Sequence, residues 1–249
     1  MRGDCRNSEA MTDPWRRRVE LAQGRAVLYE GSCFDVLPAI GPVDHIITDP
    51  PYSERTHTGA RANRPGVTGG ARLIDFPSWT AQQFGTFARA CLDITQRWTV
   101  MTCDMGHAAT LIDWPELVRL GVWVKGAPMP QISGDRPGQG HEMIACLHGP
   151  GRKRWNGGGK PAVWKATVIK DPSSAKIASQ KPVALLNALV NDFTDVDELI
   201  CDPCMGAGTS GSAAIGQGRR FLGIELDPDH FDIACERIDQ ASRQGRLFA

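Results

Sequence analysis

The tetrapeptide Asp49-Pro50-Pro51-Tyr52 places a carboxylate, a rigid turn and an aromatic ring at the end of an apolar run. That run, residues 43–48, has the composition of a buried strand. Two consecutive prolines neither continue a strand nor start a helix cleanly, so the chain must turn there. In open α/β sheets, ligands bind beside the carboxyl ends of the strands. The pattern therefore predicts a functional group, the alternative being an ordinary turn that ends a strand and exposes a tyrosine.

The chemistry open to this group is the activation of an aromatic amine. The exocyclic amine of a nucleobase is a poor nucleophile because its lone pair is delocalised into the ring. Asp49 and the carbonyl oxygen of Pro50 can both accept hydrogen bonds from one such NH2 group, which draws the nitrogen toward a tetrahedral geometry. Tyr52 can stack on the base. Because Pro50 and Pro51 hold the acceptors in advance, little reorganisation is needed during reaction, and all four residues are candidate catalytic residues.

A second motif with ligand-binding character lies between residues 202 and 225. It consists of a predicted strand, a glycine-rich turn, a short helix and a second strand, an order typical of nucleotide-cofactor sites. Gly206 and Gly208 let the backbone approach a ligand closely, and Thr209 begins the helix. Glu225, at the tip of the second strand, can hold two ribose hydroxyl groups. This half of the chain therefore predicts a nucleotide-type cofactor.

The glycine-rich turn also fits the GxGxxG pattern of dinucleotide dehydrogenases, with Gly206, Gly208 and Gly211 at the three glycine positions. Only 38 residues follow Gly211 (249 minus 211), and a dinucleotide fold needs several further strand–helix units after this pattern. A P-loop kinase or ATPase is excluded because no lysine follows the glycines. We therefore expect the N-terminal half to complete the sheet, which implies a permuted order of motifs.

Asp49–Tyr52 followed by Asp202–Thr209 resembles the DNA amino-methyltransferases that modify adenine N6 or cytosine N4, in their permuted β group. The resemblance covers most of residues 26–240. It implies an α/β Rossmann-like methyltransferase fold, with a mostly parallel seven-stranded sheet and helices on both faces. It further implies S-adenosyl-L-methionine as the cofactor, double-stranded DNA as the substrate, a target base flipped out of the duplex and no metal. A partner restriction nuclease is a further association of this family.

The resemblance also implies roles for individual cofactor residues. Asp202 matches the acidic residue near the amino group of S-adenosyl-L-methionine, and Glu225 matches the acid that binds its ribose. The segment Gln180-Lys181-Pro182 resembles the one that closes over the methionine end. The full predicted cofactor set is Ser32, Cys33, Lys181, Pro182, Asp202, Cys204, Gly206, Gly208, Thr209 and Glu225.

Three positions depart from the family pattern. Ser32 stands where the family often has an aspartate that touches the adenine of the cofactor. Cys204 replaces a frequent phenylalanine, and Ser53 follows the catalytic tyrosine where asparagine is common. The first two changes put cofactor affinity in question. None of them lies within Asp49–Tyr52, so the catalytic prediction is unaffected.

The aspartate at position 49 favours adenine N6 as the target, because family members with serine there more often modify cytosine N4. Cytosine N4 is therefore the nearest alternative. RNA and protein-glutamine amino methyltransferases are more remote, since their relatives more often carry asparagine at this position. A non-catalytic DNA-binding protein that has kept the fold is the alternative from another class, and the two intact motifs argue against it.

The overall charge does not attract a polyanion, because 28 Lys and Arg residues balance 28 Asp and Glu residues. DNA contacts must therefore come from local clusters, and two loops, 53–76 and 126–180, offer them. The alternative interpretation is a disordered surface loop for the first segment and a solvated basic loop for the second. The predicted DNA-binding residues are Arg55, Arg61, Arg64, Arg72, Arg152, Lys153, Arg154 and Trp155.

The predicted organisation is an N-terminal arm, residues 1–24, and a single methyltransferase domain, residues 25–249. The arm is polar, and we expect it to be frayed rather than bound to DNA. No apolar run approaches the roughly 20 residues that a membrane helix needs, and we expect a cytoplasmic, prokaryotic or phage-encoded protein, monomeric or homodimeric. The eight cysteines are scattered, and the pair Cys201 and Cys204 lacks a second ligand pair for zinc.

The C-terminal tail carries Gln244, Leu247 and Phe248 in the spacing of short peptides that bind the bacterial sliding clamp. The alternative is that the two apolar residues fold back onto the domain.

Hydrophobic periodicity predicts the remaining elements. Predicted strands lie at 26–30, 43–48, 98–103, 122–125, 143–147, 198–201 and 220–226. The strands at 122–125 and 143–147 are expected to pair in an antiparallel hairpin. Predicted helices lie at 80–97, 107–120 in part, 181–193, 209–217 and 229–240.

Overall fold

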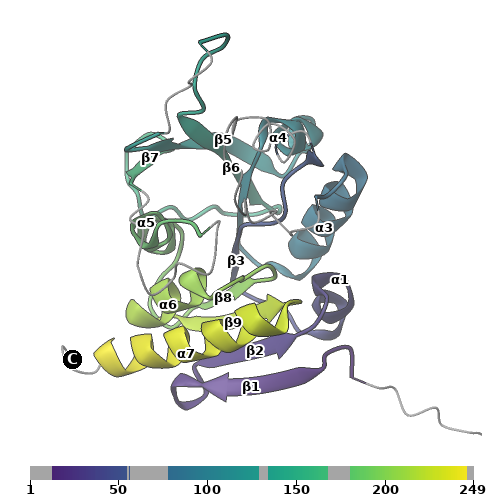
Figure 1. Ribbon diagram of the computed structural model, residues 1–249, viewed down its shortest axis with the longest axis vertical. Coiled ribbons are helices and arrows are strands. Elements are labelled where there is room, and N and C mark those ends of the chain that lie inside the picture. The colour runs from purple at the N-terminus through teal and green to yellow at the C-terminus, as the bar shows by residue number, and fades with distance from the viewer. Residues whose placement is uncertain (1–12, 55, 57–77, 129–133, 168–179, 246–249) are drawn as a thin grey trace, which may run out of the picture.

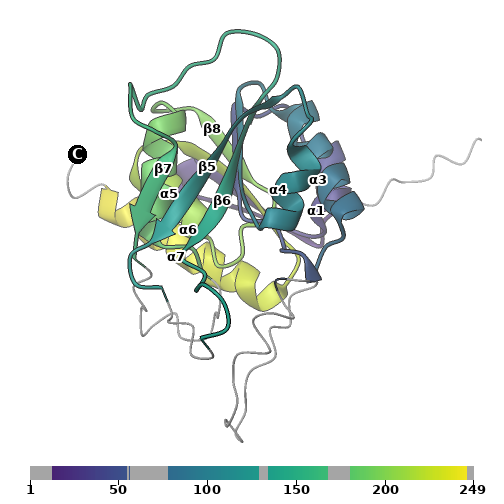
Figure 2. The ribbon, with the colours of Figure 1, turned by 90° about the horizontal axis from the view of Figure 1, so that it is seen from above.

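The computed structural model describes residues 13–54, 56, 78–128, 134–167 and 180–245. These residues form a nine-stranded sheet with helices on both faces (Figures 1 and 2). The strands are β1 (Arg17–Leu21), β2 (Ala26–Glu30), β3 (His45–Thr48), β4 (Trp98–Cys103), β5 (Leu117–Lys125), β6 (His141–His148), β7 (Val163–Ala166), β8 (Leu199–Asp202) and β9 (Arg220–Glu225). The helices are η1 (Ala22–Gly24), α1 (Cys33–Val36), η2 (Leu37–Ala39), α3 (Ala81–Ile94), α4 (Met105–Leu111), α5 (Val183–Phe193), α6 (Thr209–Gly216) and α7 (Pro228–Gly245).

The strand order across the sheet is β1-β2-β9-β8-β3-β4-β6-β5-β7. Strands β2, β9, β8, β3 and β4 pair in parallel, and β6 lies antiparallel between β4 and β5. Because β3 comes early in the chain and β8 late, the two halves of the sequence meet at the centre of the sheet. The carboxyl ends of the five parallel strands therefore share one edge with the amino end of β6. This edge carries the predicted catalytic motif Asp49–Tyr52 and is named the catalytic edge for it.

Side chains from the central strands enter two apolar layers by simple alternation. Ile47 and Val100 belong to the layer that contacts α5, α6 and α7, whereas Ile46 and Met101 belong to the layer that contacts α1, α3 and α4. Figure 2 shows these two groups of helices on opposite sides of the sheet. All four residues of β3 are buried, and its two central residues, Ile46 and Ile47, enter opposite layers.

The predicted α/β class with a mostly parallel sheet is confirmed, but the sheet has nine strands rather than the predicted seven. Most predicted elements are present with ends shifted by a few residues. The antiparallel pairing of β5 with β6 is confirmed. Helix α3 begins after a capping box in which Thr80 and Gln83 satisfy each other's backbone amides. The helix expected in part over 107–120 is shorter, because it ends at Leu111 and the chain then enters β5. Within the described residues, no helix is long and apolar enough to cross a membrane.

Strand β1 corrects the prediction that residues 1–24 form a frayed arm. It pairs antiparallel with β2, with Arg17 opposite Glu30 and Leu21 opposite Ala26. The guanidinium of Arg17 lies 4.7 Å from the ring centre of Phe231 and 2.9 Å from a carboxylate oxygen of Asp232. The prediction was wrong for residues 17–24 because β2 offers an unpaired strand edge, and arginine stems can cover apolar surface while their charged ends stay in water.

Strand β7 is the second element that the sequence did not indicate. It lies within the loop predicted at 126–180 and pairs in parallel with β5. Trp164 and Ala166 are buried while Val163 and Lys165 are exposed, so the alternation is that of an edge strand. Four alternating residues are too short a signal in the sequence, and only the free edge of β5 selects this segment as a strand.

Candidate active site

The catalytic edge brings Asp49–Tyr52 of the β3 end beside the glycine-rich turn of the β8 end and Glu225 of the β9 end. Strands β9, β8 and β3 are consecutive neighbours in the sheet. The predicted catalytic and cofactor motifs, far apart in the sequence, therefore lie together. This juxtaposition follows from the parallel pairing of β3 with β8, in which Ile46 is opposite Cys201.

The carboxylate of Asp49 is held by two neighbours and stays accessible. Lys181 places its ammonium nitrogen 2.8 Å from Asp49, and the Thr102 hydroxyl donates a hydrogen bond to Asp49 Oδ1. The Asp49 side chain is 31% exposed, which leaves room for a further donor. Lys181 is only 11% exposed, so its charge is directed into the site rather than into solvent.

Glu142 is a site residue that the sequence reasoning missed. It stands at the amino end of β6, accepts a 2.6 Å hydrogen bond from the Tyr52 hydroxyl, and forms ion pairs with Lys125 at 2.7 Å and Lys181 at 3.2 Å. Burial pushes the pKa of Glu142 upward, but the charge of Lys181 and hydrogen bonds from Lys125 and Tyr52 outweigh it and lower the pKa to about 2. Glu142 is therefore ionised and links the tyrosine to the lysine.

Lys181 contacts Asp49, Glu142 and Tyr52 from the segment that precedes α5. Its ammonium lies 4.8 Å from the ring centre of Tyr52, a cation–π distance, in addition to its contacts with Asp49 and Glu142. Burial lowers the pKa of Lys181, and the two carboxylates outweigh that effect and raise it. The preceding residue, Gln180, accepts a 3.1 Å hydrogen bond from Arg237 of α7, which also donates to the carbonyl of Ala207. The segment is thereby attached to the glycine-rich turn.

Asp104 is a second residue that the sequence did not single out. It caps α4 by accepting from the backbone amide of His107 at 2.9 Å, and it accepts from the amide of Ser53 at 2.9 Å. Burial raises the pKa of Asp104, but hydrogen bonds from Ser53, Thr56 and the backbone outweigh it and lower the pKa to about 2. An ionised Asp104 therefore anchors the chain just after Tyr52.

The two glycines of the cofactor turn have different tasks. Gly206 and Gly208 both have positive φ angles, 51° and 75°, a region that favours glycine. A Cβ atom added to Gly206 would meet nothing within 4 Å, so its face is open to a ligand. A Cβ atom on Gly208 would lie 2.9 Å from Cβ of Ala234, so this glycine lets the turn pack against α7. Both were predicted to line the cofactor, and the open face belongs to Gly206.

Glu225 points its carboxylate across this turn. One oxygen accepts from the amide of Gly206 at 2.8 Å and the other from the amide of Asp227 at 2.8 Å. Burial raises the pKa of Glu225, and the two backbone hydrogen bonds oppose the rise. Each oxygen keeps a lone pair for a hydroxyl donor. The carboxylate is thus fixed in place at the tip of β9.

Asp202 is buried and serves the framework of the site. It accepts from the hydroxyl of Thr48 at 2.7 Å, from the amide of Cys204 at 3.0 Å and from the hydroxyl of Ser210. These bonds tie the end of β3 to the glycine-rich turn and to the start of α6. Burial raises the pKa of Asp202 to about 6, and the hydrogen bonds from Ser210 and Thr48 limit the rise. Its predicted contact with the amino group of a cofactor stays a prediction.

Asp202→Asn should change how stability depends on pH. Because the folded pKa, about 6, lies above the ordinary value of 3.8, this carboxyl contributes stability that is complete below 3.8 and is lost as the pH rises through 6. When the pH is lowered from 7 to 4, the free energy of unfolding of wild type should therefore rise by about 1 to 3 kcal/mol relative to that of Asp202→Asn. Denaturant unfolding of both proteins measures the difference, in which all other carboxyls cancel. A difference that is constant with pH would contradict the assignment.

The other predicted cofactor residues surround the turn with varied exposure. Cys33 begins α1 and is buried, and Ser32 accepts a 3.2 Å hydrogen bond from the amide of Phe34 as the cap of that helix. Pro182 is buried at the start of α5, and Thr209 is buried at the start of α6. Cys204 is half-buried, while Cys201 is buried at the end of β8. In the described part of the chain, no group of three or more His, Cys, Asp or Glu side chains is placed to hold a metal ion.

The predicted DNA-binding residues divide into two groups. Arg55, Arg61, Arg64 and Arg72 lie outside the described residues. The second group, residues 152–155, follows the carboxyl end of the antiparallel strand β6, so it lies at the edge of the sheet opposite Asp49. The structure therefore does not bring this group to the catalytic edge.

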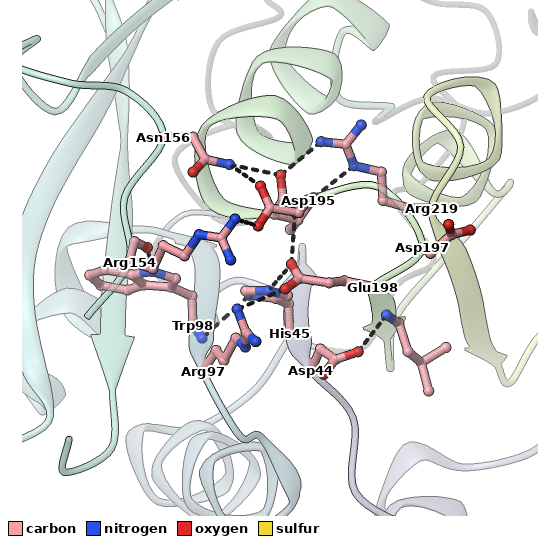
Figure 3. Close-up of polar contacts among 12 residues, drawn as sticks. Asp44, His45, Arg97, Trp98, Arg154, Asn156, Asp195, Asp197, Glu198 and Arg219 are labelled. Atoms are coloured by element: carbon pink, nitrogen blue, oxygen red, sulfur yellow. Dashed lines mark hydrogen bonds and ion pairs between the residues drawn. The ribbon is translucent and has the colours of Figure 1, made fainter. Parts of the chain in front are cut away.

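Arg154 and Trp155 have partners within the fold, as Figure 3 shows for Arg154. Arg154 forms an ion pair with Asp195, and its carbonyl accepts from the Trp98 indole. The ring of Trp155 lies 4.9 Å from that of Phe193 and donates through its indole nitrogen to the carbonyl of Gly158 at 2.8 Å. These contacts explain by packing why Arg154 and Trp155 are basic and aromatic.

The same opposite edge holds a polar network around the half-buried residues Asp195 and Glu198 (Figure 3). Glu198 accepts from the amide of Asp195 at 2.7 Å and pairs with His45 at 2.8 Å and with Arg97 at 2.7 Å. Asp195 also accepts from Asn156 at 2.9 Å. Burial lowers the pKa of His45, opposed by its bond to Glu198. This network stabilises the sheet away from the site.

The C-terminal tail is only partly described. Gln244 is exposed in the last turn of α7, while Leu247 and Phe248 lie outside the described residues. Binding of a sliding clamp through these three residues stays a prediction.

Comparison with known proteins shows which proteins this chain resembles. A family model described as DNA methylase (N6_N4_Mtase) matches residues 115–236. The type II methyltransferase M.XycI of Xanthomonas campestris pv. cyanopsidis is 27% identical over 129 residues, which cover 47% of this chain and 42% of that protein. The chain thus spans less than half the length of that relative. The type II methyltransferase M.HinfI of Haemophilus influenzae is 24% identical over 243 residues, covering 85% of this chain and 67% of that protein.

Solved structures share the fold. The M1.HpyAVI–SAM complex superposes with a TM-score of 0.64 at 21% identity and covers 86% of this chain and 99% of that one. The cytosine-N4-specific PvuII DNA methyltransferase superposes with a TM-score of 0.69 at 12% identity and covers 93% and 96% of the two chains. The family model thus covers just under half of this chain, which resembles DNA methylases of the permuted order, with the motif Asp49–Tyr52 first and the glycine-rich motif Asp202–Glu225 last.

Proposed function

We propose that this protein transfers a methyl group from S-adenosyl-L-methionine to the N6 amine of adenine in DNA, with the target base turned out of the double helix. The observation that carries the proposal is the accessible carboxylate of Asp49 beside Tyr52, at the same sheet edge as Gly206 and Glu225. A base stacked inside a duplex cannot reach a carboxylate at the bottom of such an edge, so it must be extruded.

The cofactor end of the site fits a nucleoside with an attached amino acid. The open face of Gly206 lets a ligand approach the backbone, and Glu225 presents two fixed carboxylate oxygens to a pair of ribose hydroxyls. One structural neighbour, M1.HpyAVI, was solved as a complex with SAM, the same cofactor. When bound, S-adenosyl-L-methionine supplies a methyl group on a positively charged sulfur, and the carbon–sulfur bond breaks as the carbon–nitrogen bond forms.

The base end of the site is built to receive an aromatic amine. Asp49 and the carbonyl of Pro50 accept hydrogen bonds from the two N–H groups of the amine, which localises the lone pair on nitrogen and directs it away from both acceptors. Tyr52 stacks on the base, and its hydroxyl is held by Glu142 at 2.6 Å, which sets the orientation of the ring. Asp49 accepts the proton that leaves the nitrogen after it gains the methyl group, and passes it to solvent.

Lys181 occupies the contacts that the base would make. Its ammonium donates to Asp49 and lies over the ring of Tyr52, which are the two places assigned to the amine and to the aromatic ring of the base. We therefore infer that Lys181 moves away from Asp49 when the base enters. Glu142 remains as its counter-ion at 3.2 Å, so the ammonium is not left unpaired.

The choice of adenine over cytosine rests on Asp49 alone. One neighbour with a similar fold is cytosine-N4-specific, and the activation of the amine is the same for either base. Residues 25–249 act in this proposal as one catalytic domain. DNA contacts come from the loop 53–76 and from those parts of 126–180 that leave the sheet at the catalytic edge, 126–140 after β5 and 167–180 after β7.

The test of the proposed function is the chemical identity of the product. The protein is incubated with methyl-labelled S-adenosyl-L-methionine and genomic DNA, and the DNA is digested to nucleosides. Label in N6-methyldeoxyadenosine supports the proposal, whereas label in N4-methyldeoxycytidine reassigns the base and leaves the mechanism in place. DNA without label would overturn the proposal as a whole, provided that the DNA is unmodified beforehand.

Glu225→Gln should weaken cofactor binding. The glutamine loses the charge that strengthens hydrogen bonds from ribose hydroxyls, and its NH2 group cannot accept from one of the two backbone amides, of Gly206 and Asp227, that the carboxylate binds. Affinity for S-adenosyl-L-homocysteine should therefore fall roughly 10- to 100-fold. Calorimetry measures the loss. Glu236→Gln, which changes an exposed carboxylate on α7, is the matched control and should leave affinity unchanged. Equal affinity of Glu225→Gln and wild type would show that this carboxylate does not hold the ribose.

A further inference from the structure

The ammonium of Lys181 stands where the target base would bind. Its nitrogen lies 2.8 Å from Asp49, 3.2 Å from Glu142 and 4.8 Å from the ring centre of Tyr52. Asp49 and Tyr52 are the residues that the proposed function assigns to the amine and to the ring of the base. The side chain of Lys181 is only 11% exposed, so its charge depends on these partners rather than on water. Any base that enters the site must therefore change the contacts of Lys181.

Entry of the base replaces two of these three contacts. The amine takes the place of the ammonium at Asp49, and the stacked base covers the face of Tyr52. Glu142 remains, but it also accepts from the Tyr52 hydroxyl at 2.6 Å and pairs with Lys125 at 2.7 Å. An ammonium carries three donors, and a buried charged donor without an acceptor is costly. Binding of the base is therefore favoured if the base itself brings an acceptor to Lys181.

Adenine brings such an acceptor beside its amine. The ring nitrogen N1 is bonded to the carbon that carries the amine, and in a base turned out of the duplex its lone pair has lost its pairing partner. The ammonium that leaves Asp49 needs to shift only to this nitrogen, which lies two bonds from the amine that replaces it. Cytosine offers the same two groups, because its N3 adjoins the N4 amine. Guanine and thymine carry a hydrogen on the ring nitrogen of that edge, which would place a donor against the ammonium.

We propose that Lys181 donates a hydrogen bond to the ring nitrogen beside the reacting amine, which is N1 in adenine and N3 in cytosine. Asp49 then reads the donor and Lys181 the neighbouring acceptor of the same base. Lys181 is thereby a specificity-determining residue for the base, which differs from its predicted place among the cofactor residues. The inference rests on the proposed function, because it takes a nucleobase with an exocyclic amine as the substrate.

The test compares two DNA duplexes that differ in one ring atom of the target base. Both contain the recognised site, located by sequencing methylated genomic DNA, and one carries 1-deazaadenine, which keeps the amine and replaces N1 by C–H. A cytosine target would be replaced by 3-deazacytosine. The two duplexes compete in one reaction with labelled S-adenosyl-L-methionine, and the ratio of label gives the ratio of kcat/KM. Wild type should prefer the natural base at least about tenfold, the scale of one charge-assisted hydrogen bond.

Lys181→Met should reduce this preference to less than about threefold. Lys125→Met is the matched control and should keep it, because Lys125 pairs with the same Glu142 at 2.7 Å but lies over the ring of Trp123 rather than that of Tyr52. The analogue also weakens the base pair and alters the amine, but these effects act on every variant alike. If turnover of Lys181→Met is too slow, the same competition is read as duplex binding in the presence of S-adenosyl-L-homocysteine.

The outcomes separate the inference from the proposed function. If wild type transfers no label to genomic DNA, the proposed function fails and the inference with it. If wild type methylates DNA but accepts both duplexes equally, or if Lys181→Met keeps the wild-type preference, the inference fails alone. Loss of the preference in Lys125→Met would assign it to Glu142 and also overturn the inference. Thermal unfolding of each variant shows whether the fold is intact.

Cofactor affinity distinguishes the two roles considered for Lys181. Calorimetry with S-adenosyl-L-homocysteine should give Lys181→Met an affinity within a few-fold of wild type, because the inference places the ammonium on the base. A large loss of this affinity, with the preference for the natural base retained, would return Lys181 to the cofactor and overturn the inference.

Discussion

Replacement of Asp49 by alanine is expected to lower kcat for methyl transfer by roughly 10²- to 10³-fold or more, the scale seen when one preorganised transition-state contact is removed. The amine loses the acceptor that localises its lone pair, and the carbonyl of Pro50 alone cannot replace it. Cofactor affinity should stay within a few-fold of wild type, because the proposed function assigns Asp49 to the amine rather than to the cofactor. The fold should also persist, since Lys181 keeps Glu142 as a counter-ion at 3.2 Å.

Single-turnover kinetics with labelled cofactor measure kcat, and calorimetry with S-adenosyl-L-homocysteine measures affinity. Asp113→Ala, an exposed carboxylate after α4, is the control and should match wild type in both. Loss of cofactor affinity together with activity would refute the division of tasks between Asp49 and the glycine-rich turn. Full activity in Asp49→Ala would remove Asp49 from the mechanism.

Glu142→Gln is expected to lower kcat roughly 10- to 100-fold, although Glu142 is assigned no contact with either substrate. Removal of its charge leaves Lys181 with Asp49 as its remaining carboxylate partner in this group. The ammonium should then bind Asp49 more tightly and compete with the amine of the base. The hydroxyl of Tyr52 keeps an acceptor, because the glutamine amide oxygen can replace the carboxylate oxygen.

Two further variants test this explanation. Tyr52→Phe keeps the ring and removes only the hydroxyl. If Glu142→Gln acts through Lys181, Tyr52→Phe should lower kcat less than Glu142→Gln does. Addition of Lys181→Met to Glu142→Gln should recover part of the lost rate, because the competing ammonium is gone. A double variant whose loss equals the product of the two single losses would show that the two residues act independently.

The parts of this protein that the sequence determined by itself are those set by local backbone preference. Two prolines after an apolar run force the turn that carries Asp49 and Tyr52, whatever the rest of the chain does. Glycines at 206 and 208 are required by φ angles of 51° and 75°, and the alternation of strand and helix around them is a short-range pattern. The catalytic motif, the cofactor motif and the α/β class could therefore be predicted from the sequence.

The permuted order was also open to prediction, because Asp49–Tyr52 precedes the glycine-rich motif in the sequence. The two outer strands, β1 and β7, could not be predicted from the sequence. Both are short and carry exposed charge, and each becomes a strand because a neighbouring strand offers an unpaired edge. An edge exists only after the central strands have assembled, so no local pattern could mark these segments.

Only the tertiary structure decided which distant residues complete the site and which charged side chains form ion pairs within the fold. Glu142 reaches Tyr52 because β6 runs antiparallel, which places its first residues rather than its last at the catalytic edge. Arg154 has the composition of a DNA contact, but it leaves the opposite end of that strand and pairs with Asp195. The direction of a strand depends on long-range pairing, and a charged residue carries no local sign of the partner that packing will bring to it.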